Sequence, residues 1–202
     1  MSTVPKIVDI TTTPARPARA FLRDVIDTMA RIHRDQGRSI FALTAPNRRA
    51  GTSYVVNLLA EELVSQFEAT VGIVPAAAFK GVDATRIPQG FVEHAPNIWT
   101  AVSDQTLENM PDFALEGVCV SSGGSHCDFI LIDCPALDCS SQALRSASIA
   151  DGIFLVVEAG VTRTEQIEAA VRLLDAPPAR RLQGIILNRR TYPIPKFLYQ
   201  LL

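Results

Sequence analysis

The sequence SIFALTAPNRRAGTSY, residues 39–54, joins a short apolar run to a loop and then to the start of a helix. The run covers residues 39–44 and the loop covers residues 45–51. In the helix that follows, apolar side chains recur every four residues and share one face: Val55, Leu59, Leu63 and Phe67. A strand that leads through a loop into an amphipathic helix is the building unit of α/β proteins. The segment therefore predicts the first unit of such a fold.

Further short apolar runs follow along the chain, and helical patterns lie between several of them. The runs cover residues 71–74, 97–102, 129–132, 153–157 and 182–187. One helical pattern runs from Leu22 to a stop at Gly37, and another begins at a T-x-x-E capping box from Thr162 to Glu165. Apolar strands that alternate with amphipathic helices predict a parallel sheet covered on both sides. The expected fold class is α/β, a doubly wound, mostly parallel sheet with helices on both faces.

Length and composition indicate one folded domain. The chain has 202 residues, of which 48% are hydrophobic and 20% charged, and this balance excludes a disordered chain. We expect a flexible tail over residues 1–17, which are rich in threonine and proline, and a single domain over residues 18–202. Residues 79–96 and 117–126 are expected to be loops.

Charge and hydropathy narrow the classes of partner. The 19 Lys and Arg residues against 21 Asp and Glu leave a net charge of −2, which argues against a nucleic-acid partner. No apolar stretch approaches the roughly 20 residues that span a bilayer, and the N-terminus has no signal-peptide core. We therefore expect a cytoplasmic protein that reaches a membrane only through a partner.

The loop after the first apolar run partly matches the phosphate-binding pattern G-x-x-x-x-G-K-[ST]. Pro46 occupies the first glycine position, Gly51 the second, Thr52 the lysine position and Ser53 the hydroxyl position. Two of the four defining positions match, which by itself is a weak signal.

The wider sequence strengthens that signal. The segment ILIDCP, residues 130–135, is an apolar strand that ends in Asp133, and an Asp at such a strand end can hold the water shell of Mg²⁺. The segments ADGIFLVV, residues 150–157, and GIILNR, residues 184–189, follow.

These segments resemble the cytoplasmic domain of bacterial tyrosine kinases (BY-kinases), in the MinD/ParA-like branch of P-loop ATPases. The resemblance covers about residues 20–190 and includes NLLA at residues 57–60. It implies a P-loop NTPase-like fold and a family that uses ATP and Mg²⁺. It also implies a partner, an inner-membrane polysaccharide co-polymerase that regulates chain length.

The departures from the family pattern bear on activity. Thr52 cannot supply the charge of the family's loop lysine, and Pro75 and Ala77 replace both carboxylates of its D-x-D motif. Phosphoryl transfer depends on positioning and charge stabilisation, so these losses should cost on the order of 10³-fold or more in rate. We therefore expect no catalytic residues, no measurable ATP turnover and at most millimolar nucleotide affinity, in a pseudokinase-like protein.

Several residues remain candidates for a degenerate nucleotide site. The set is Arg48, Arg49, Gly51, Thr52, Ser53 and Asn188, with Ser53 and Asp133 as candidate Mg²⁺ ligands.

Each of these candidates has a plainer alternative. The two arginines either replace the lysine charge or are solvated loop residues. Ser53 either binds Mg²⁺ or caps the helix, and Asp133 either binds Mg²⁺ or is inherited scaffolding. Asn188 matches the family position that contacts adenine, but it is also an ordinary turn residue.

Two further expectations concern the loop and a zinc site. Pro46 has no N–H, and the loop has side chains where glycines favour an anion cradle, so we expect it to be distorted or collapsed relative to a phosphate nest. A zinc site is disfavoured because the nearby histidine and cysteines form no C-x₂-C pair: His126, Cys127, Cys134 and Cys139.

The ends of the domain bear on assembly. Around Arg23 the family's E-x-x-R-x-x-R oligomerisation pattern is broken by Ala20 and Ile26, so ring assembly through it is in doubt, and a homo-oligomer stays open. After Arg190 the chain ends with two tyrosines, Tyr192 and Tyr199, among apolar residues. We expect this end to be a docking element or part of the core, not a phosphorylation substrate.

Three functions compete on these grounds. The preferred one is a non-catalytic BY-kinase-like module that regulates or scaffolds exopolysaccharide or capsule production by docking to the co-polymerase. The alternative is an active ATPase or tyrosine kinase of the same pathway in which Arg48 or Arg49 stands in for lysine. A ParA-like partitioning ATPase is disfavoured, because it needs the loop lysines and a basic DNA-binding surface.

Overall fold

The computed structural model describes residues 6–9, 17–36, 39–75, 78, 90–102, 120–122, 127–176 and 181–189. The helices are α1 (Pro17–Gln36), α2 (Thr52–Phe67), α5 (Gln142–Ile149) and α6 (Thr164–Asp175). The strands are β1 (Lys6–Asp9), β2 (Ser39–Thr44), β3 (Val71–Pro75), β4 (Gly90–Ala95), β5 (Ile98–Val102), β6 (Val120–Ser122), β7 (Phe129–Asp133), β8 (Gly152–Glu158) and β9 (Leu182–Asn188). None of these helices is long and apolar enough to cross a membrane.

All described strands join one nine-stranded sheet in the order β1-β9-β8-β2-β7-β3-β5-β4-β6. Every pairing from β1 across to β5 is parallel, and β4 pairs antiparallel with both β5 and β6, so that β4 alone among the described strands is reversed. Strand β2 lies between β7 and β8, so the loop that follows it opens between two neighbouring strand ends. The predicted fold class is confirmed.

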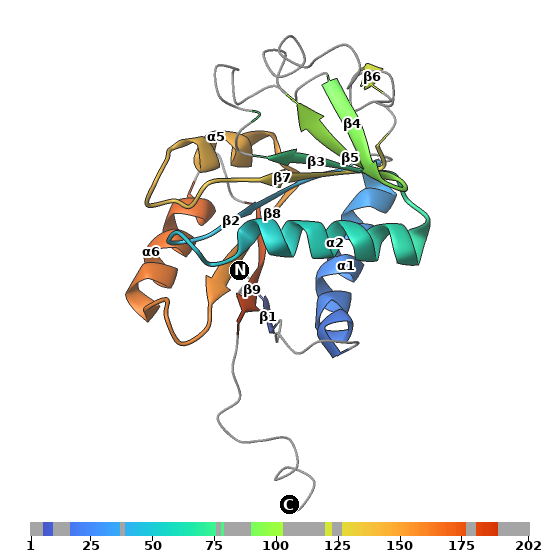
Figure 1. The fold of residues 1–202 in the computed structure, drawn as a ribbon. Helices are drawn as coiled ribbons and strands as arrows, with labels where there is room; N and C mark the ends of the chain where they lie inside the picture. The colour runs from blue at the N-terminus through green and yellow to red at the C-terminus, as the bar shows by residue number, and fades with distance from the viewer. Residues whose placement is uncertain are drawn as a thin grey trace, which may run out of the picture.

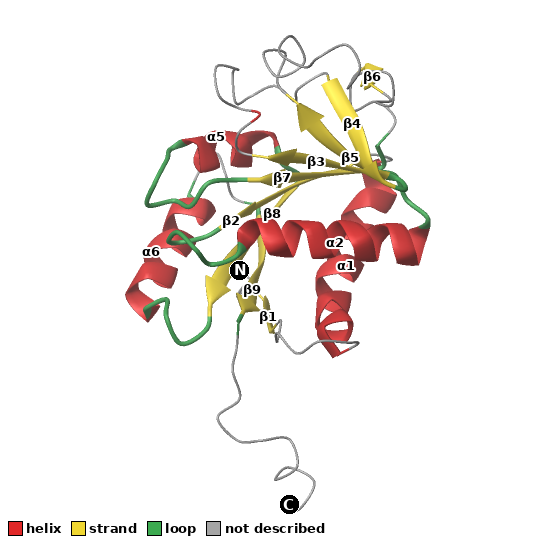
Figure 2. Ribbon diagram, viewed as in Figure 1, coloured by secondary structure: helices red, strands yellow, loops and turns green. Residues whose placement is uncertain are grey.

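Helices cover the sheet on both faces (Figures 1 and 2). Helices α1 and α2 pack with Phe41 and Leu43 of β2 on one face, in a core that includes Phe129 and Phe154. Helices α5 and α6 pack on the other face, where Ala42 of β2 points. Because successive side chains of a strand point to opposite faces, a central strand covered on both sides is buried at nearly every position, as β2 is, and its residues 40–43 are all apolar.

Three strands lie where the sequence predicted irregular structure. The prediction of a tail over residues 1–17 is wrong for Lys6–Asp9, which form β1 and pair with β9. The predicted loops over residues 79–96 and 117–126 contain β4 and β6. β1 and β6 are short and form the two edges of the sheet, and β4 pairs with β6, so backbone pairing specifies these strands more than any periodic pattern does.

The start of two helices also differs from expectation. Pro17, which had suggested a helix-restricting tail, is the first residue of α1, a position where the missing N–H costs nothing. The capping box predicted at Thr162 and Glu165 is wrong by one residue. Helix α6 begins after Arg163, whose N–H donates to Oε1 of Gln166 at 3.0 Å.

Some expectations fall outside the described residues. These are the apolar C-terminal segment after Arg190, with both of its tyrosines, as well as Ala77 of the lost D-x-D motif and His126 of the disfavoured zinc set.

Candidate functional site

The loops that follow β2 and β7 run side by side at the carboxyl edge of the sheet. The N–H of Cys134 donates to the Leu43 carbonyl at 2.9 Å, and the N–H of Leu137 donates to the Ala45 carbonyl at 2.9 Å. The Thr44 hydroxyl donates to the Pro135 carbonyl at 2.9 Å. These bonds hold the two strand exits together at the edge where open α/β sheets bind their ligands.

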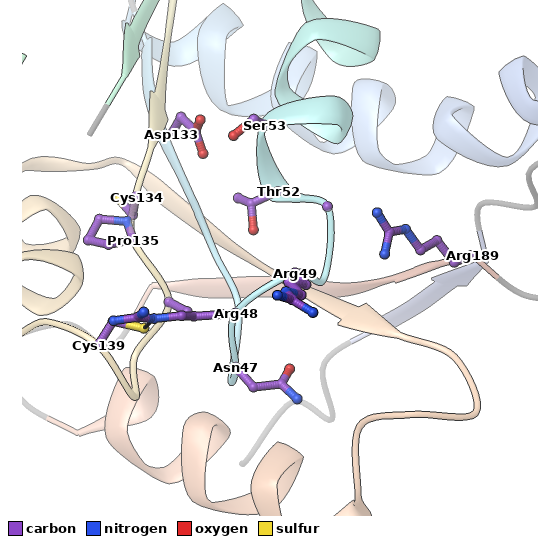
Figure 3. A pocket seen from close by; sticks show the side chains of 12 residues that line it. Asn47, Arg48, Arg49, Thr52, Ser53, Asp133, Cys134, Pro135, Cys139 and Arg189 are labelled. Atoms are coloured by element: carbon purple, nitrogen blue, oxygen red, sulfur yellow. Dashed lines mark hydrogen bonds between the residues drawn. The ribbon is translucent and has the colours of Figure 1, made fainter. Parts of the chain in front are cut away.

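A cavity of about 580 Å³ opens beside these loops (Figure 3). Its lining residues are Asn47, Arg48, Arg49, Gly51, Thr52, Ser53, Asp133, Cys134, Pro135, Ala136, Cys139 and Arg189. Of the predicted site residues, only Asn188 is not among them. That the loop is distorted or collapsed relative to a phosphate nest remains a prediction.

Sequence reasoning missed several lining residues. Arg189 is the last residue of the GIILNR segment, so the strand-end position was itself a usable signal. Asn47 lies in the loop already singled out. Cys139 comes from the turn after β7, and no local pattern pointed to it.

Gly51 connects the loop to α2 and adopts a left-handed backbone, with φ of 85°. The first helical bond runs from the Val55 N–H to the Gly51 carbonyl at 3.1 Å, and no side chain caps the helix. The N–H groups of the first turn therefore precede the intrahelical ladder and face the loop side. The capping role considered for Ser53 is not found.

Asn188 ties the end of β9 to this loop. Its side chain is buried, its Nδ2 donates to the Ala50 carbonyl at 2.8 Å, and its Oδ1 accepts from the Arg189 N–H at 2.9 Å. A Cβ on Gly51 would collide with Nδ2 of Asn188. Asn188 therefore positions the loop through a long-range hydrogen bond. The sequence pattern predicted an adenine contact or a turn residue, and it did not predict this role.

Asp133 and Ser53 lie side by side and point toward each other at the cavity (Figure 3). Burial raises the pKa of Asp133 above its usual range, and a hydrogen bond with the Ser53 side chain opposes that shift. The strand beside it, β3, places Pro75 in register with Asp133.

The described residues do not fit a Mg²⁺ site of the kind that the resemblance implies. Among the described residues that line the cavity, Asp133 is the only one with a carboxylate. No group of three histidine, cysteine or acidic residues in the described part of the chain could hold a metal ion. A single partly desolvated carboxylate and one hydroxyl offer fewer oxygen ligands than such a site uses.

Three arginines border the same cavity. Arg48 Nε donates to Cys139 Sγ at 2.7 Å, and Cys139 in turn donates to Oδ1 of Asp138 at 2.7 Å. These neighbours raise the pKa of Arg48. Arg189 Nη1 lies 3.2 Å from Oε1 of Glu158. The exposed side chain of Arg49 forms no ion pair within the described residues.

The cysteines at the site differ in environment. Cys134 is 3% exposed, and burial raises its pKa to about 12, so it stays a neutral thiol at physiological pH. Cys139 is partly exposed and hydrogen-bonded between Arg48 and Asp138.

A polar chain links the loop to the exit of β8. Thr162 Oγ1 accepts from the Glu158 N–H at 3.2 Å and donates to Oδ1 of Asn47 at 3.4 Å. The same Glu158 holds Arg189 through its carboxylate. The three segments that border the cavity are therefore mutually bonded.

Comparisons with known proteins agree with this architecture. No family model and no curated protein matches the sequence. The kinase domain of the Escherichia coli tyrosine kinase ETK is similar in structure, with a TM-score of 0.60 and 16% identity over 92% of this chain and 83% of that chain. The BceF tyrosine kinase domain gives a TM-score of 0.57 and 21% identity, over 90% of this chain and 82% of that one.

The wider branch is represented as well. The MinD cell division protein of Aquifex aeolicus gives a TM-score of 0.54 and 16% identity, over 80% of this chain and 72% of that chain. At these identities the likeness concerns the fold. It confirms the fold that the sequence resemblance implied, that of BY-kinase domains and MinD-like ATPases.

Replacing Gly51 by alanine tests the bond between the loop and β9. Gly51→Ala combines left-handed strain with loss of the buried Asn188 bond, so we expect it to lower the free energy of unfolding by about 2–4 kcal/mol. Gly160 is the matched control, because its φ is 76° and a Cβ there would meet nothing within 4 Å. Gly160→Ala should cost only about 1–2 kcal/mol. Urea unfolding measures both, and equal losses would contradict the assigned role of Asn188.

The desolvated carboxylate predicts a pH-dependent stability. Because burial raises the pKa of Asp133, the folded state binds its proton more tightly than the unfolded state, and stability falls as the pH rises through the folded pKa. Asp133→Asn should therefore raise the urea midpoint at pH 8, and the gain should shrink toward pH 4.

The control for this variant is Asp138→Asn, which removes an exposed carboxylate of the adjacent turn. It should give no such gain. If the difference in urea midpoint between Asp133→Asn and the unsubstituted chain is the same at all pH values, burial of the charge does not cause that difference.

Proposed function

We propose that this chain is a non-catalytic BY-kinase-like module that regulates or scaffolds bacterial exopolysaccharide or capsule synthesis and export. In this proposal it acts at the inner face of the inner membrane by docking to a polysaccharide co-polymerase. The likeness to tyrosine kinase domains in fold supports the family part, and the sequence resemblance supports the partner.

One observation carries the non-catalytic part. At the strand end where the family's second motif would place a carboxylate beside Asp133, this chain has Pro75 in direct register with it. Thr52 occupies the lysine position and lines the same cavity. Phosphoryl transfer is achieved by positioning and charge stabilisation, and these two positions lack the charges that stabilise it.

The surface is compatible with a docking role. Large apolar side chains are exposed on α2, on α6 and just before α6: Tyr54, Phe67, Leu173 and Val161. Single exposed apolar residues are common on monomers, so the proposed partner rests on the family resemblance. These residues are candidate positions for mutations that test docking.

The alternative is an active, atypical ATPase or tyrosine kinase. Its support is the presence of Arg48 and Arg49 beside the helix start, where a cation would be needed. Arg48, however, is hydrogen-bonded to Cys139 at the exit of β7. The two functions differ in one readout, which is turnover of ATP.

We expect no ATP hydrolysis and no tyrosine phosphorylation by the purified chain with Mg²⁺ and ATP, because the missing charges remove most of the transition-state stabilisation. Phosphate release and anti-phosphotyrosine detection measure the two activities. Turnover that disappears in Asp133→Ala but persists in Asp138→Ala would contradict the proposal and favour the alternative.

The cellular part of the proposal has its own test. Deletion of the gene in its host should change the amount or chain length of the surface polysaccharide. Both the unsubstituted chain and Asp133→Asn should restore it, because a scaffold does not need the carboxylate. Unchanged polysaccharide after deletion would overturn the pathway, and rescue only by the unsubstituted chain would overturn the non-catalytic role.

A further inference from the structure

A second cavity, of about 340 Å³, opens at the amino edge of the sheet, where β7 begins. The last turn of α1, the end of α2 and the start of β7 line it with His33, Arg34, Phe67, Glu68, Asp128 and Phe129. Both helices end on the right in Figure 1, whereas the loop between β2 and α2 lies on the left. Phe129 lines this cavity and Asp133 lines the first one, and these two ends of β7 are about 13 Å apart.

Aromatic rings form much of the wall of this second cavity. The His33 ring packs on the Phe129 ring, with a separation of 4.4 Å between the ring centroids and a tilt of 33°. Phe67 is the last residue of α2 and stays 45% exposed, although it lines the same cavity. The cavity volume lies within the range of small-ligand sites. A flat apolar group that fills the cavity would therefore cover Phe67 and gain contacts between aromatic rings.

Two polar atoms near Phe129 are buried and have no hydrogen-bond partner among the described residues. One is Nδ1 of His33, and the other is Oγ of Ser39. Ser39 is wholly buried and lies in register with Phe129, so the side chains of these two residues point to the same face of the sheet. Buried polar groups are nearly always hydrogen-bonded, and an unsatisfied one calls for an explanation such as a bound water or ligand.

The charges at this cavity disfavour an anion. Glu68 and Asp128 are acidic, and Arg34 is the only arginine or lysine among the described lining residues. Oδ2 of Asp128 already accepts from the Thr70 N–H at 2.8 Å. Both α1 and α2 end here, and the carbonyl groups of a helix C-terminus carry partial negative charge. A nucleotide or another phosphate is therefore a poor occupant.

We infer that this cavity binds an aromatic ring that carries a hydroxyl group, of the phenol class, with the hydroxyl placed at His33 Nδ1. A hydroxyl both donates and accepts, so it complements Nδ1 whichever nitrogen of the imidazole carries the proton. The ring contributes the apolar contact with Phe67 and Phe129. The inference goes beyond the proposed function, because this cavity lies apart from the loop between β2 and α2.

Titration calorimetry of the full chain with p-cresol tests the inference, because p-cresol has the ring and the hydroxyl of a tyrosine side chain. We expect saturable binding of one molecule, with a Kd of about 0.1–2 mM. Toluene is the matched ligand without the hydroxyl. It should bind at least about fivefold more weakly, since it leaves Nδ1 unsatisfied.

The phenol group has two possible sources, a free phenol and a tyrosine side chain of a partner protein. N-acetyltyrosine amide distinguishes them, because it carries a peptide backbone on the same ring. If it binds at least as tightly as p-cresol, the cavity takes a tyrosine of a polypeptide. If only p-cresol binds, the cavity takes a free phenol. Either result supports the inference.

Substitutions identify the groups that bind. His33→Phe keeps an aromatic ring and removes Nδ1, so it should raise the Kd of p-cresol about five- to tenfold and leave the Kd of toluene unchanged. Phe67→Ala removes part of the wall and should weaken both ligands about three- to tenfold. Leu173→Ala is the matched control, because Leu173 is an apolar side chain of similar exposure on α6, 49%, and both Kd values should stay the same.

Thermal unfolding of each variant checks that it remains folded. The inference is overturned if p-cresol shows no saturable binding, in which case the cavity holds only water. It is also overturned if toluene binds as tightly as p-cresol, or if His33→Phe weakens the two ligands equally.

Discussion

The buried hydrogen bond from Asn188 to the Ala50 carbonyl is the constraint on which the site depends. It joins the end of β9 to the loop after β2, two segments that are 138 residues apart in the chain. The close approach leaves no room for a side chain at position 51, so the loop turns into α2 through a left-handed glycine. It also places Arg189 at the rim of the cavity, because that residue directly follows the anchoring asparagine. A buried amide that bonds at both ends makes this arrangement rigid.

The chemistry of the cavity follows from which charges remain around that anchor. The lysine position holds Thr52, and Pro75 lies in register with Asp133 where a second carboxylate would extend the acidic edge. What remains is a carboxylate whose pKa is raised by burial, together with three arginines, of which Arg48 is hydrogen-bonded to Cys139 and Arg189 is paired with Glu158. One carboxylate and one hydroxyl offer fewer oxygen ligands than a Mg²⁺ site uses. The proposed module therefore has the fold of a BY-kinase domain, but the charges at the carboxyl edge of its sheet differ from those of a kinase.

The central part of the fold was predictable because it is specified by local patterns. Strand β2 is apolar on both faces, and α2 repeats apolar residues every four positions, so both elements could be read directly. The site loop, Ser53 and Asp133 were predicted to lie together because parallel strand ends share one edge of the sheet. The edge strands β1 and β6, and β4 next to β6, were missed because backbone pairing with other strands stabilises them, and such pairing gives no periodic sequence pattern in short segments.

The sequence by itself determined the doubly wound core, the location of the loop and the absence of the loop lysine and of the carboxylates at Pro75 and Ala77, because each depends on residue type and spacing along the chain. The roles of Asn188, Arg189 and Cys139 became apparent only in the folded chain. Asn188 is a loop anchor because β9 lies two strands away from β2, and Cys139 is a partner of Arg48 because the exits of β2 and β7 are bonded together. Both roles depend on contacts between segments far apart in the chain, and such contacts cannot be predicted from periodicity or motif spacing.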